Sequence, residues 1–218
     1  MKAYIFDFDG VLVDSMATYA GCMLRILDEI GIPYSSDIIK IITPLGSAGT
    51  AKYFQQLGLQ MTDSEILTQI GKYLYDAYAH HIQAKPEVIS TLQQLKEKGI
   101  RLNILTAGPH VTLDPCVQRL GIADLFENIW SCDDFQTGKT DPNIYTMAAQ
   151  RLGLSTDEIL FLDDNYNADK AAKAAGLTVC GVYDDSSKEY ESAIREIADH
   201  YIYSLSELLT LSKDGDCL

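Results

Sequence analysis

Short apolar runs alternate with segments of helical periodicity from residue 86 onward. Runs of this kind occupy 100–106, 128–132, 159–164, 178–183 and 200–205, and another lies at 3–8. Apolar strands that are linked by helices form parallel sheets, because each crossover lays a helix on one face of the sheet. The sequence therefore predicts an α/β fold, with a Rossmann-like three-layer core built on a parallel sheet.

The stretch 15–83 interrupts this alternation, because it shows helical patterns only. Helices are expected at 16–30, 49–57 and 63–81. Thr62 and Glu65 have the spacing of a capping box at the start of the last of these helices. We therefore predict two domains, whose bounds are 1–14 with 84–218 for a catalytic core and 15–83 for an inserted α-helical cap.

Charge and length limit the partners of this chain. Its 218 residues include 17 Lys and Arg against 31 Asp and Glu, a formal net charge of -14. Such a chain repels nucleic acid and anionic membranes, and no apolar run reaches the roughly 20 residues of a membrane span. We expect no nucleic-acid or membrane partner, and an anionic ligand would need a cation at its site.

The five cysteines are scattered and form no C-x-x-C motif, which argues against a disulfide framework and a structural zinc site. Acidic residues interrupt the first apolar stretch too early for a signal peptide. A cytoplasmic protein with reduced thiols is expected. The sequence leaves open whether it is a monomer or a dimer.

Asp7 and Asp9 follow the first apolar run, with Gly10 behind them. If both lie on a strand, two residues apart, their side chains point to the same face and lie about 6–7 Å from each other. Such carboxylates repel each other unless they share a proton or a cation, and a hard dication such as Mg²⁺ prefers oxygen ligands. One carboxylate could attack phosphorus while the other moves a proton. A plain Asp-rich turn is the alternative for this pair taken alone.

Other polar residues follow further strands of the predicted sheet. Thr106 ends one strand before Ala107 and Gly108, Asp163 and Asp164 end another, and Lys139 precedes a helix. Ligands of open parallel sheets bind at the carboxyl ends of the strands. A hydroxyl group and exposed backbone N–H groups can hold phosphate oxygens. Adjacent strand residues point to opposite faces, so only one acid of this second pair can point at a metal while the strand continues.

Four segments resemble the motifs of the haloacid dehalogenase-like superfamily. They read "DFDGVLVDS", "ILTAG", "GKTDPNIY" and "FLDDNYNADKAAKAAG". The branch that they resemble most is that of phosphoglycolate phosphatase and beta-phosphoglucomutase. The resemblance runs over about 1–15 and 84–210, and it implies a Rossmann-like core with a helical cap after the first motif. It also implies magnesium-dependent phosphoryl transfer on a small phosphorylated metabolite.

The resemblance implies a role for each matching residue. Asp7 is expected to be the nucleophile and a metal ligand, and Asp9 the general acid and base, whose backbone carbonyl also binds the metal. Thr106, Ala107 and Gly108 are expected to bind the phosphoryl group, and Lys139 to stabilise Asp7 and that group. Asp164 is expected to ligate the metal, with Asp163 as a further ligand or a neighbour of the ligands.

Three positions depart from the superfamily pattern. Ala107 stands where an Asn often follows the Thr, so only its backbone can contribute. Ala168 stands where many relatives carry a second acid, and Glu87 replaces the glycine that usually follows Pro86. Because Ala168 cannot supply that acid, metal binding is expected to depend more on Asp163.

The predicted function is a phosphatase that forms an aspartyl-phosphate. A sugar-phosphate mutase is an alternative, although Tyr19 stands where such relatives carry a His early in the cap. A catalytically silent phosphate-binding relative is another. A response-regulator receiver is disfavoured, because there the acid pair precedes the phosphorylated Asp. The glycine-containing segment 43–54 is a candidate substrate loop, but it does not identify a metabolite.

Overall fold

The computed structural model describes residues 1–42 and 45–211. The chain folds into two compact units, each described by itself below. The core unit comprises Met1–Ser15 and Gln83–Leu218, and the helical unit comprises Met16–Ile82. The helical unit is thus an insertion between the first strand of the core and its remaining strands.

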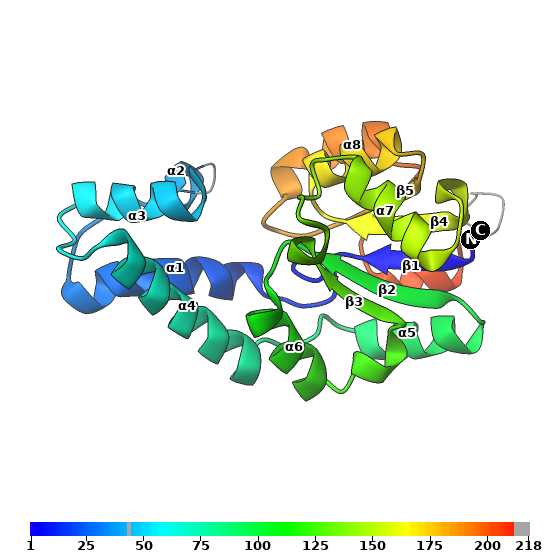
Figure 1. Ribbon diagram of the computed structural model, residues 1–218, viewed down its shortest axis with the longest axis horizontal. Helices are drawn as coiled ribbons and strands as arrows, with labels where there is room; N and C mark the ends of the chain where they lie inside the picture. The colour runs from blue at the N-terminus through cyan, green and yellow to red at the C-terminus, as the bar shows by residue number, and fades with distance from the viewer. Residues whose placement is uncertain (43–44, 212–218) are drawn as a thin grey trace. The chain divides into compact units, whose positions relative to one another are not determined.

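A six-stranded sheet, in which every neighbouring pair is parallel, forms the middle layer of the core unit (Figure 1). Its strand order is β3-β2-β1-β4-β5-β6. The strands are β1 Ala3–Phe6, β2 Arg101–Thr106, β3 Asn128–Ser131, β4 Ile159–Asp163, β5 Thr178–Val182 and β6 His200–Ile202. The predicted α/β class and the parallel sheet are confirmed.

Helices cover both faces of this sheet. They are α5 Val88–Glu97, α6 His110–Arg119, α7 Asn143–Leu152, α8 Tyr166–Ala174 and α9 Glu191–Ile197. Helices α5 and α6 lie on one face, and α7 and α8 lie on the other (Figure 1). This is the three-layer arrangement that the sequence predicts, because each parallel connection must cross a face of the sheet.

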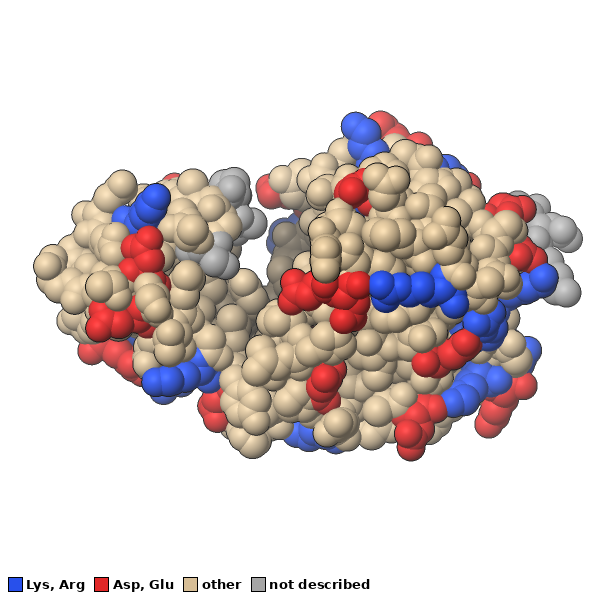
Figure 2. All heavy atoms as spheres, viewed as in Figure 1, with Lys and Arg blue, Asp and Glu red and all other residues tan. Residues whose placement is uncertain are grey.

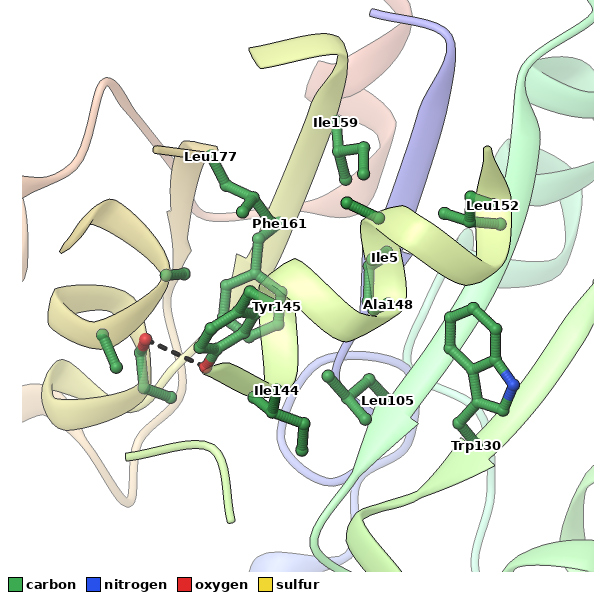
Figure 3. Close-up of a cluster of buried hydrophobic side chains, with 14 of the residues drawn as sticks. Ile5, Leu105, Trp130, Ile144, Tyr145, Ala148, Leu152, Ile159, Phe161 and Leu177 are labelled. Carbon is green, nitrogen blue, oxygen red and sulfur yellow. Dashed lines mark hydrogen bonds between the residues drawn. The ribbon is translucent and has the colours of Figure 1, made fainter. Parts of the chain in front are cut away.

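A cluster of buried side chains fills the space between the sheet and α7 and α8 (Figure 3). Tyr145 of α7 is fully buried at its centre and packs edge-on against Phe161 of β4, with ring centroids 4.9 Å apart. The Tyr145 hydroxyl lies 2.8 Å from the Lys139 carbonyl oxygen and 3.0 Å from that of Ala168. This buried ring therefore links the strand layer to the loop before α7 and to α8.

The helical unit consists of four helices within the described residues. They are α1 Met16–Ile30, α2 Ile38–Ile42, α3 Gly46–Gln56 and α4 Asp63–His80. The predicted capping box at α4 is confirmed, since the Thr62 side chain accepts from the Glu65 N–H and the Glu65 carboxylate accepts from the Thr62 N–H. The short α2 was not expected, and α3 begins before the predicted residue 49. Two residues of the candidate substrate loop, Thr43 and Pro44, lie outside the described residues.

Lys and Arg side chains are interspersed with Asp and Glu on the face of the molecule that Figure 2 shows. Among the described residues, no helix combines the length and the apolar character that a membrane span requires.

The chain leaves the core unit and returns to it through two adjacent segments. Val13 and Ala84 form an isolated antiparallel bridge. Beside them, the Asp14 N–H donates to the Gln83 carbonyl at 3.0 Å, and the Lys85 N–H donates to the Leu12 carbonyl, also at 3.0 Å. The insertion is therefore closed at its base by backbone hydrogen bonds of the core itself.

Glu87, just after this return, adopts a left-handed backbone conformation with φ 61°. This conformation is costly for a residue with a Cβ, which agrees with the glycine that superfamily relatives usually carry there. Two hydrogen bonds hold the exposed Glu87 side chain: the hydroxyl groups of Ser204 and Ser206 donate to its Oε2 at 3.2 Å and 2.7 Å. These contacts offset part of the backbone strain.

Replacing Glu87 separates these two effects. Glu87→Gly and Glu87→Ala both lose the serine contacts, but only glycine relieves the strain at φ 61°. We expect the glycine variant to be the more stable of the two by about 0.5–1 kcal/mol, after allowance for the freedom that glycine gains in the unfolded chain. Urea unfolding of both variants measures this difference. Equal stability, or a more stable alanine variant, would contradict it.

Candidate active site

The candidate active site lies where the sheet reverses its strand order, at the carboxyl ends of β1 and β4. The Phe6–Leu162 pairing sets the register, so Asp7 follows β1 at the level of Asp163, the last residue of β4. The Asp7 N–H donates to the Leu162 carbonyl at 2.8 Å. Ligands of open α/β sheets bind at such switch points.

The first strand ends earlier than the sequence predicts. Because β1 stops at Phe6, Asp7 and Asp9 lie in the loop after it, and the argument that strand alternation puts them on one face does not apply. The Asp7 Oδ1 accepts from the Phe8 N–H at 2.7 Å, which turns the backbone at this point. Asp7 is nearly buried, with 7 % of its surface exposed.

Lys139 forms two ion pairs with carboxylates of different strands. Its Nζ lies 2.8 Å from Asp7 Oδ1 and 2.7 Å from Asp163 Oδ2. Burial by itself would lower the pKa of Lys139, but the carboxylates of Asp163 and Asp7 overcome this and raise it well above the usual value. The ammonium group therefore stays charged and holds the ends of β1 and β4 together.

A third carboxylate joins this group. Asp7, Asp163 and Asp164 each offer one oxygen, and these oxygens lie within 4.8 Å of one another. Both acids of the second pair offer an oxygen to this group, because β4 ends at Asp163 and strand alternation does not continue to Asp164. Burial, followed by the neighbouring carboxylates, raises the pKa of Asp164. Burial also raises the pKa of Asp163, against the lowering effect of Lys139.

The charges of this cluster suit a dication. Three nearly buried carboxylates face one ammonium group, so their ionised forms leave an excess of negative charge. A hard dication prefers such oxygen ligands and would favour the charged forms of Asp163 and Asp164, whose pKa values burial raises. The donor set thus fits the predicted cation.

Gly10 allows Asp164 to approach the loop that follows β1. Its φ is +77°, and a Cβ built there would lie 3.0 Å from the Asp164 Cγ and from both of its carboxylate oxygens. Real Cβ atoms rarely come so close to other atoms, and side chains rarely adopt this backbone conformation. The glycine of the first motif is therefore needed both for the turn and for the position of Asp164.

The loop after β2 brings Gly108 close to Asp9. Buried Thr106 accepts the Gly108 N–H through its Oγ1 at 3.0 Å, and Ala107 is exposed between them. A Cβ built at Gly108 would lie 3.5 Å from Thr106 Oγ1 and 3.7 Å from Asp9 Oδ2. The Asp9 Oδ1 accepts from the Ser15 hydroxyl at 2.6 Å. The predicted site residues thus lie at the carboxyl ends of β1, β2 and β4, either as the last residue of a strand or in the loop after it, and Lys139 contacts two of them.

Comparison with known proteins gives the family. Residues 1–176 match the family model described as haloacid dehalogenase-like hydrolase. The chain belongs to the haloacid dehalogenase-like hydrolase family. This confirms the resemblance found in its motifs, and with it the prediction of a hydrolytic enzyme that has phosphatases among its relatives.

Relatives of this hydrolase match it over most of their length. YhcW of Bacillus subtilis (strain 168), a protein named provisionally as a phosphatase, is 29% identical over 210 residues, covering 95% of this chain and 94% of that protein. The phosphoglycolate phosphatase of Escherichia coli (strain K12) is 27% identical over 205 residues, covering 84% and 81%. A solved structure from Thermotoga maritima, named provisionally as a beta-phosphoglucomutase, has a TM-score of 0.82 and 24% identity, covering 98% and 99%.

The hydrolase also carries a buried acid that the sequence analysis did not single out. Asp169 in α8 is 0% exposed, and both of its carboxylate oxygens lack a hydrogen-bond partner among the described residues. Burial, followed by the nearby charge of Asp163, raises its pKa well above the usual value. The sequence signal for Asp169 is its place between Ala168 and Ala171, on the apolar face of a helix.

His110 was also missed. It is the first residue of α6, and each of its ring nitrogens lies 2.9 Å from a carboxylate oxygen, one from Asp114 and the other from Asp134. Only its distance of four residues from Thr106 connects it to a motif. Its partners come from separate elements, so the sequence alone offers no further signal.

The proton that Asp169 retains predicts how stability depends on pH. Because the folded state binds this proton more tightly than the unfolded chain, the free energy of unfolding falls as pH rises from about 4 toward the folded pKa. In Asp169→Asn this contribution is absent. Relative to wild type, the variant should become more stable with rising pH, by up to roughly 1.4 kcal/mol per pH unit.

Urea unfolding of both proteins between about pH 4 and pH 7, in the presence of a chelator, measures this difference. Asp163 and Asp164 are present in both proteins, so the difference reports the loss of Asp169 together with its effect on the neighbouring Asp163. A difference that does not change with pH would show that Asp169 is ionised in the folded protein.

Proposed function

We propose that this hydrolase is a magnesium-dependent phosphatase that hydrolyses a small phosphorylated metabolite through an aspartyl-phosphate on Asp7. The observation that carries the proposal is the bridge of Lys139 between Asp7 and Asp163, in a group of carboxylates that reaches Asp164. The phosphatase names of the relatives support the reaction class. A location in the cytoplasm belongs to the same proposal, and the free thiols of the four described cysteines suit it.

Asp7 is the nucleophile of the proposed reaction. Its Oδ1 accepts from the Phe8 N–H and lies against Lys139 Nζ, so Oδ2 is the oxygen available for attack. The new bond joins Oδ2 to phosphorus, and the bond from phosphorus to the substrate oxygen breaks. Lys139 orients Asp7, because its Nζ lies 2.8 Å from the Asp7 Oδ1.

Asp9 moves the proton in both half-reactions. It gives a proton to the departing substrate oxygen, then takes one from the water that attacks the phosphorus of the aspartyl-phosphate. This water releases inorganic phosphate and restores the Asp7 carboxylate. The Ser15 hydroxyl, which donates to Asp9 Oδ1 at 2.6 Å, orients the carboxyl group beside the loop of Gly108.

The loop after β2 binds the phosphoryl oxygens in this proposal. Since Thr106 Oγ1 already accepts from the Gly108 N–H, its own hydrogen is available to donate to a phosphoryl oxygen. The exposed Ala107 offers its backbone N–H. Gly108 contributes by shaping this turn.

Mg²⁺ would be held by Asp7, by Asp164 and by the backbone carbonyl of Asp9. Both oxygens of Asp163 already accept hydrogen bonds, from Lys139 and from the Asn165 N–H, so we assign it to holding Lys139 beside the ligands. When bound, the ion neutralises charge on the phosphoryl oxygens. The helical unit would act as the cap that selects the substrate.

A screen of phosphorylated metabolites with and without Mg²⁺ tests the proposal. Release of inorganic phosphate supports a phosphatase. Transfer of the phosphoryl group to another sugar phosphate would instead support the mutase alternative. Absence of both reactions would favour a catalytically silent phosphate-binding protein.

Asp7→Asn should abolish turnover, with a loss of at least about a thousandfold in kcat, because a neutral amide cannot attack phosphorus. Asp157→Asn removes an exposed acid just before β4, at the opposite end of that strand, and is the matched control with unchanged kinetics. Turnover of an aryl phosphate measures both variants. Normal activity of Asp7→Asn would exclude the aspartyl-phosphate.

Asp9→Asn should slow turnover at least about 100-fold, because it removes the positioned acid and base. Magnesium binding should stay largely intact, because the proposed contact is the backbone carbonyl. Calorimetric titration with Mg²⁺, alongside steady-state kinetics, separates these effects. Unchanged kinetics would remove the proton-transfer role from Asp9, and loss of magnesium binding would make its side chain a ligand.

A further inference from the structure

His110 begins α6 directly after the loop of Thr106, Ala107 and Gly108, and it connects two carboxylates. Its Nδ1 lies 2.9 Å from Asp114 Oδ1 on the same helix. Its Nε2 lies 2.9 Å from Asp134 Oδ2, on the 3₁₀ turn Cys132–Phe135 that follows β3. The ring thus joins the loops that follow two neighbouring strands of the sheet.

Both contacts require the ring to be charged. A neutral imidazole carries one N–H and can donate to only one carboxylate, whereas imidazolium donates from both nitrogens. The hydrogen bond to Asp114, and then the one to Asp134, raises the pKa of His110 above its usual value. The contacts of this ring with the two carboxylates thus favour the imidazolium form.

The Asp134 side of this contact is firmly anchored. The same Oδ2 accepts from the Ser131 N–H at 2.9 Å, and an Arg151 side-chain nitrogen donates to the Asp134 carbonyl at 2.7 Å. The Arg151 guanidinium also lies over the Phe135 ring, 3.8 Å from its centroid. Arg151 of α7 is therefore a second cation that acts on Asp134 beside His110.

The chain continues from this turn to Lys139, the residue that bridges the two strand-end acids. One loop that His110 joins thus carries the phosphate donors of the proposed site, and the other leads to the ammonium group that faces the same phosphate. The register of β2 and β3 fixes where both loops begin, since Thr106 pairs with Ser131. His110 adds a charged contact beyond the end of that pairing.

We propose that His110 is a positioning residue, whose imidazolium ties the Thr106–Gly108 loop to the turn at Asp134 and so sets the phosphate donors relative to Lys139. This inference rests on the proposed phosphatase function. It concerns binding of the phosphoryl group and leaves the attack by Asp7 unchanged. A loosened tie should therefore raise KM and weaken inhibition by inorganic phosphate, while kcat stays nearly constant.

The expected change in KM is modest, because the side chains that form the contact are partly exposed to water. The side chains of His110 and Asp134 are 39% and 33% exposed, so water screens their attraction. We expect His110→Ala to raise KM and the inhibition constant of inorganic phosphate together, by about threefold to fivefold near pH 6, where the wild-type ring is charged. The ratio of the variant KM to the wild-type KM should fall toward 1 as pH rises through the pKa of the ring, because the wild-type ring then loses its proton and one of its two contacts.

Asp114→Asn is the matched control, because it removes a carboxylate from the same ring but leaves the contact between the loops. Near pH 6 its KM should equal that of wild type. Its KM should begin to rise at a lower pH, since the ring has lost one of the two acids that hold its proton. A structural role alone would not produce this shift of the pH profile.

Asp134→Asn removes the carboxylate that contacts His110 Nε2, and it keeps an oxygen that can accept from the Ser131 N–H. It should reproduce the KM increase of His110→Ala, and the double variant should add nothing further. If His110→Ala does not fold, Asp134→Asn carries the test. Thermal unfolding of every variant, followed by circular dichroism, verifies that each is folded at the assay temperature.

Steady-state kinetics with an aryl phosphate and inorganic phosphate, from about pH 6 to pH 9, decides the matter. If the wild-type protein turns over and both His110→Ala and Asp134→Asn keep the wild-type KM, the role of His110 is overturned and the proposed function stands. A KM increase independent of pH, or a loss confined to kcat, would also overturn that role. A wild-type protein with neither turnover nor calorimetric binding of inorganic phosphate would overturn the proposed function and this inference together.

Discussion

The charged contact of Lys139 with Asp7 and Asp163 is the interaction on which the rest of the site depends. Burying two carboxylates without a partner would cost several kcal/mol each, and a shared ammonium group removes much of that cost. Lys139 is itself held through its backbone, because its carbonyl lies within hydrogen-bonding distance of the buried Tyr145 hydroxyl. The hydrophobic core and the charged site are thus connected at one residue, and the packing of Tyr145 against Phe161 positions both.

The parallel sheet explains why these acids meet at all. Neighbouring parallel strands end at the same edge, and the register of β1 with β4 places residues 156 positions apart in the sequence side by side. The site then holds more negative charge than one ammonium group can balance, and Asp169 adds a further acid nearby. A fold that concentrates acids in this way is suited to binding a cation, and its charge balance changes when that cation and an anionic substrate arrive.

Sequence patterns were sufficient for the features that rest on local chemistry. The apolar runs gave five of the strands to within one or two residues and β6 to within three, the Thr62–Glu65 box gave the start of α4, and the motifs gave the family. Sequence patterns did not predict the features that tertiary packing determines. The end of β1 at Phe6 reflects a turn that Asp7 itself caps, and the position of Asp164 beside Asp163 depends on where β4 stops. The contacts of His110 join residues 24 apart, which no local period can reveal, and the roles given to the site residues remain predictions.

The closed base of the helical insertion has a consequence for how such a protein can change over time. Val13 and Ala84 are bridged and the flanking backbone groups are paired with each other, so the core itself holds the two ends of the insertion together. Lengthening a loop adds little entropic cost once its ends are fixed. The intervening helices can therefore be rebuilt or exchanged while the carboxylates and the lysine keep their positions, so that new substrate preferences can arise on an unaltered chemical scaffold.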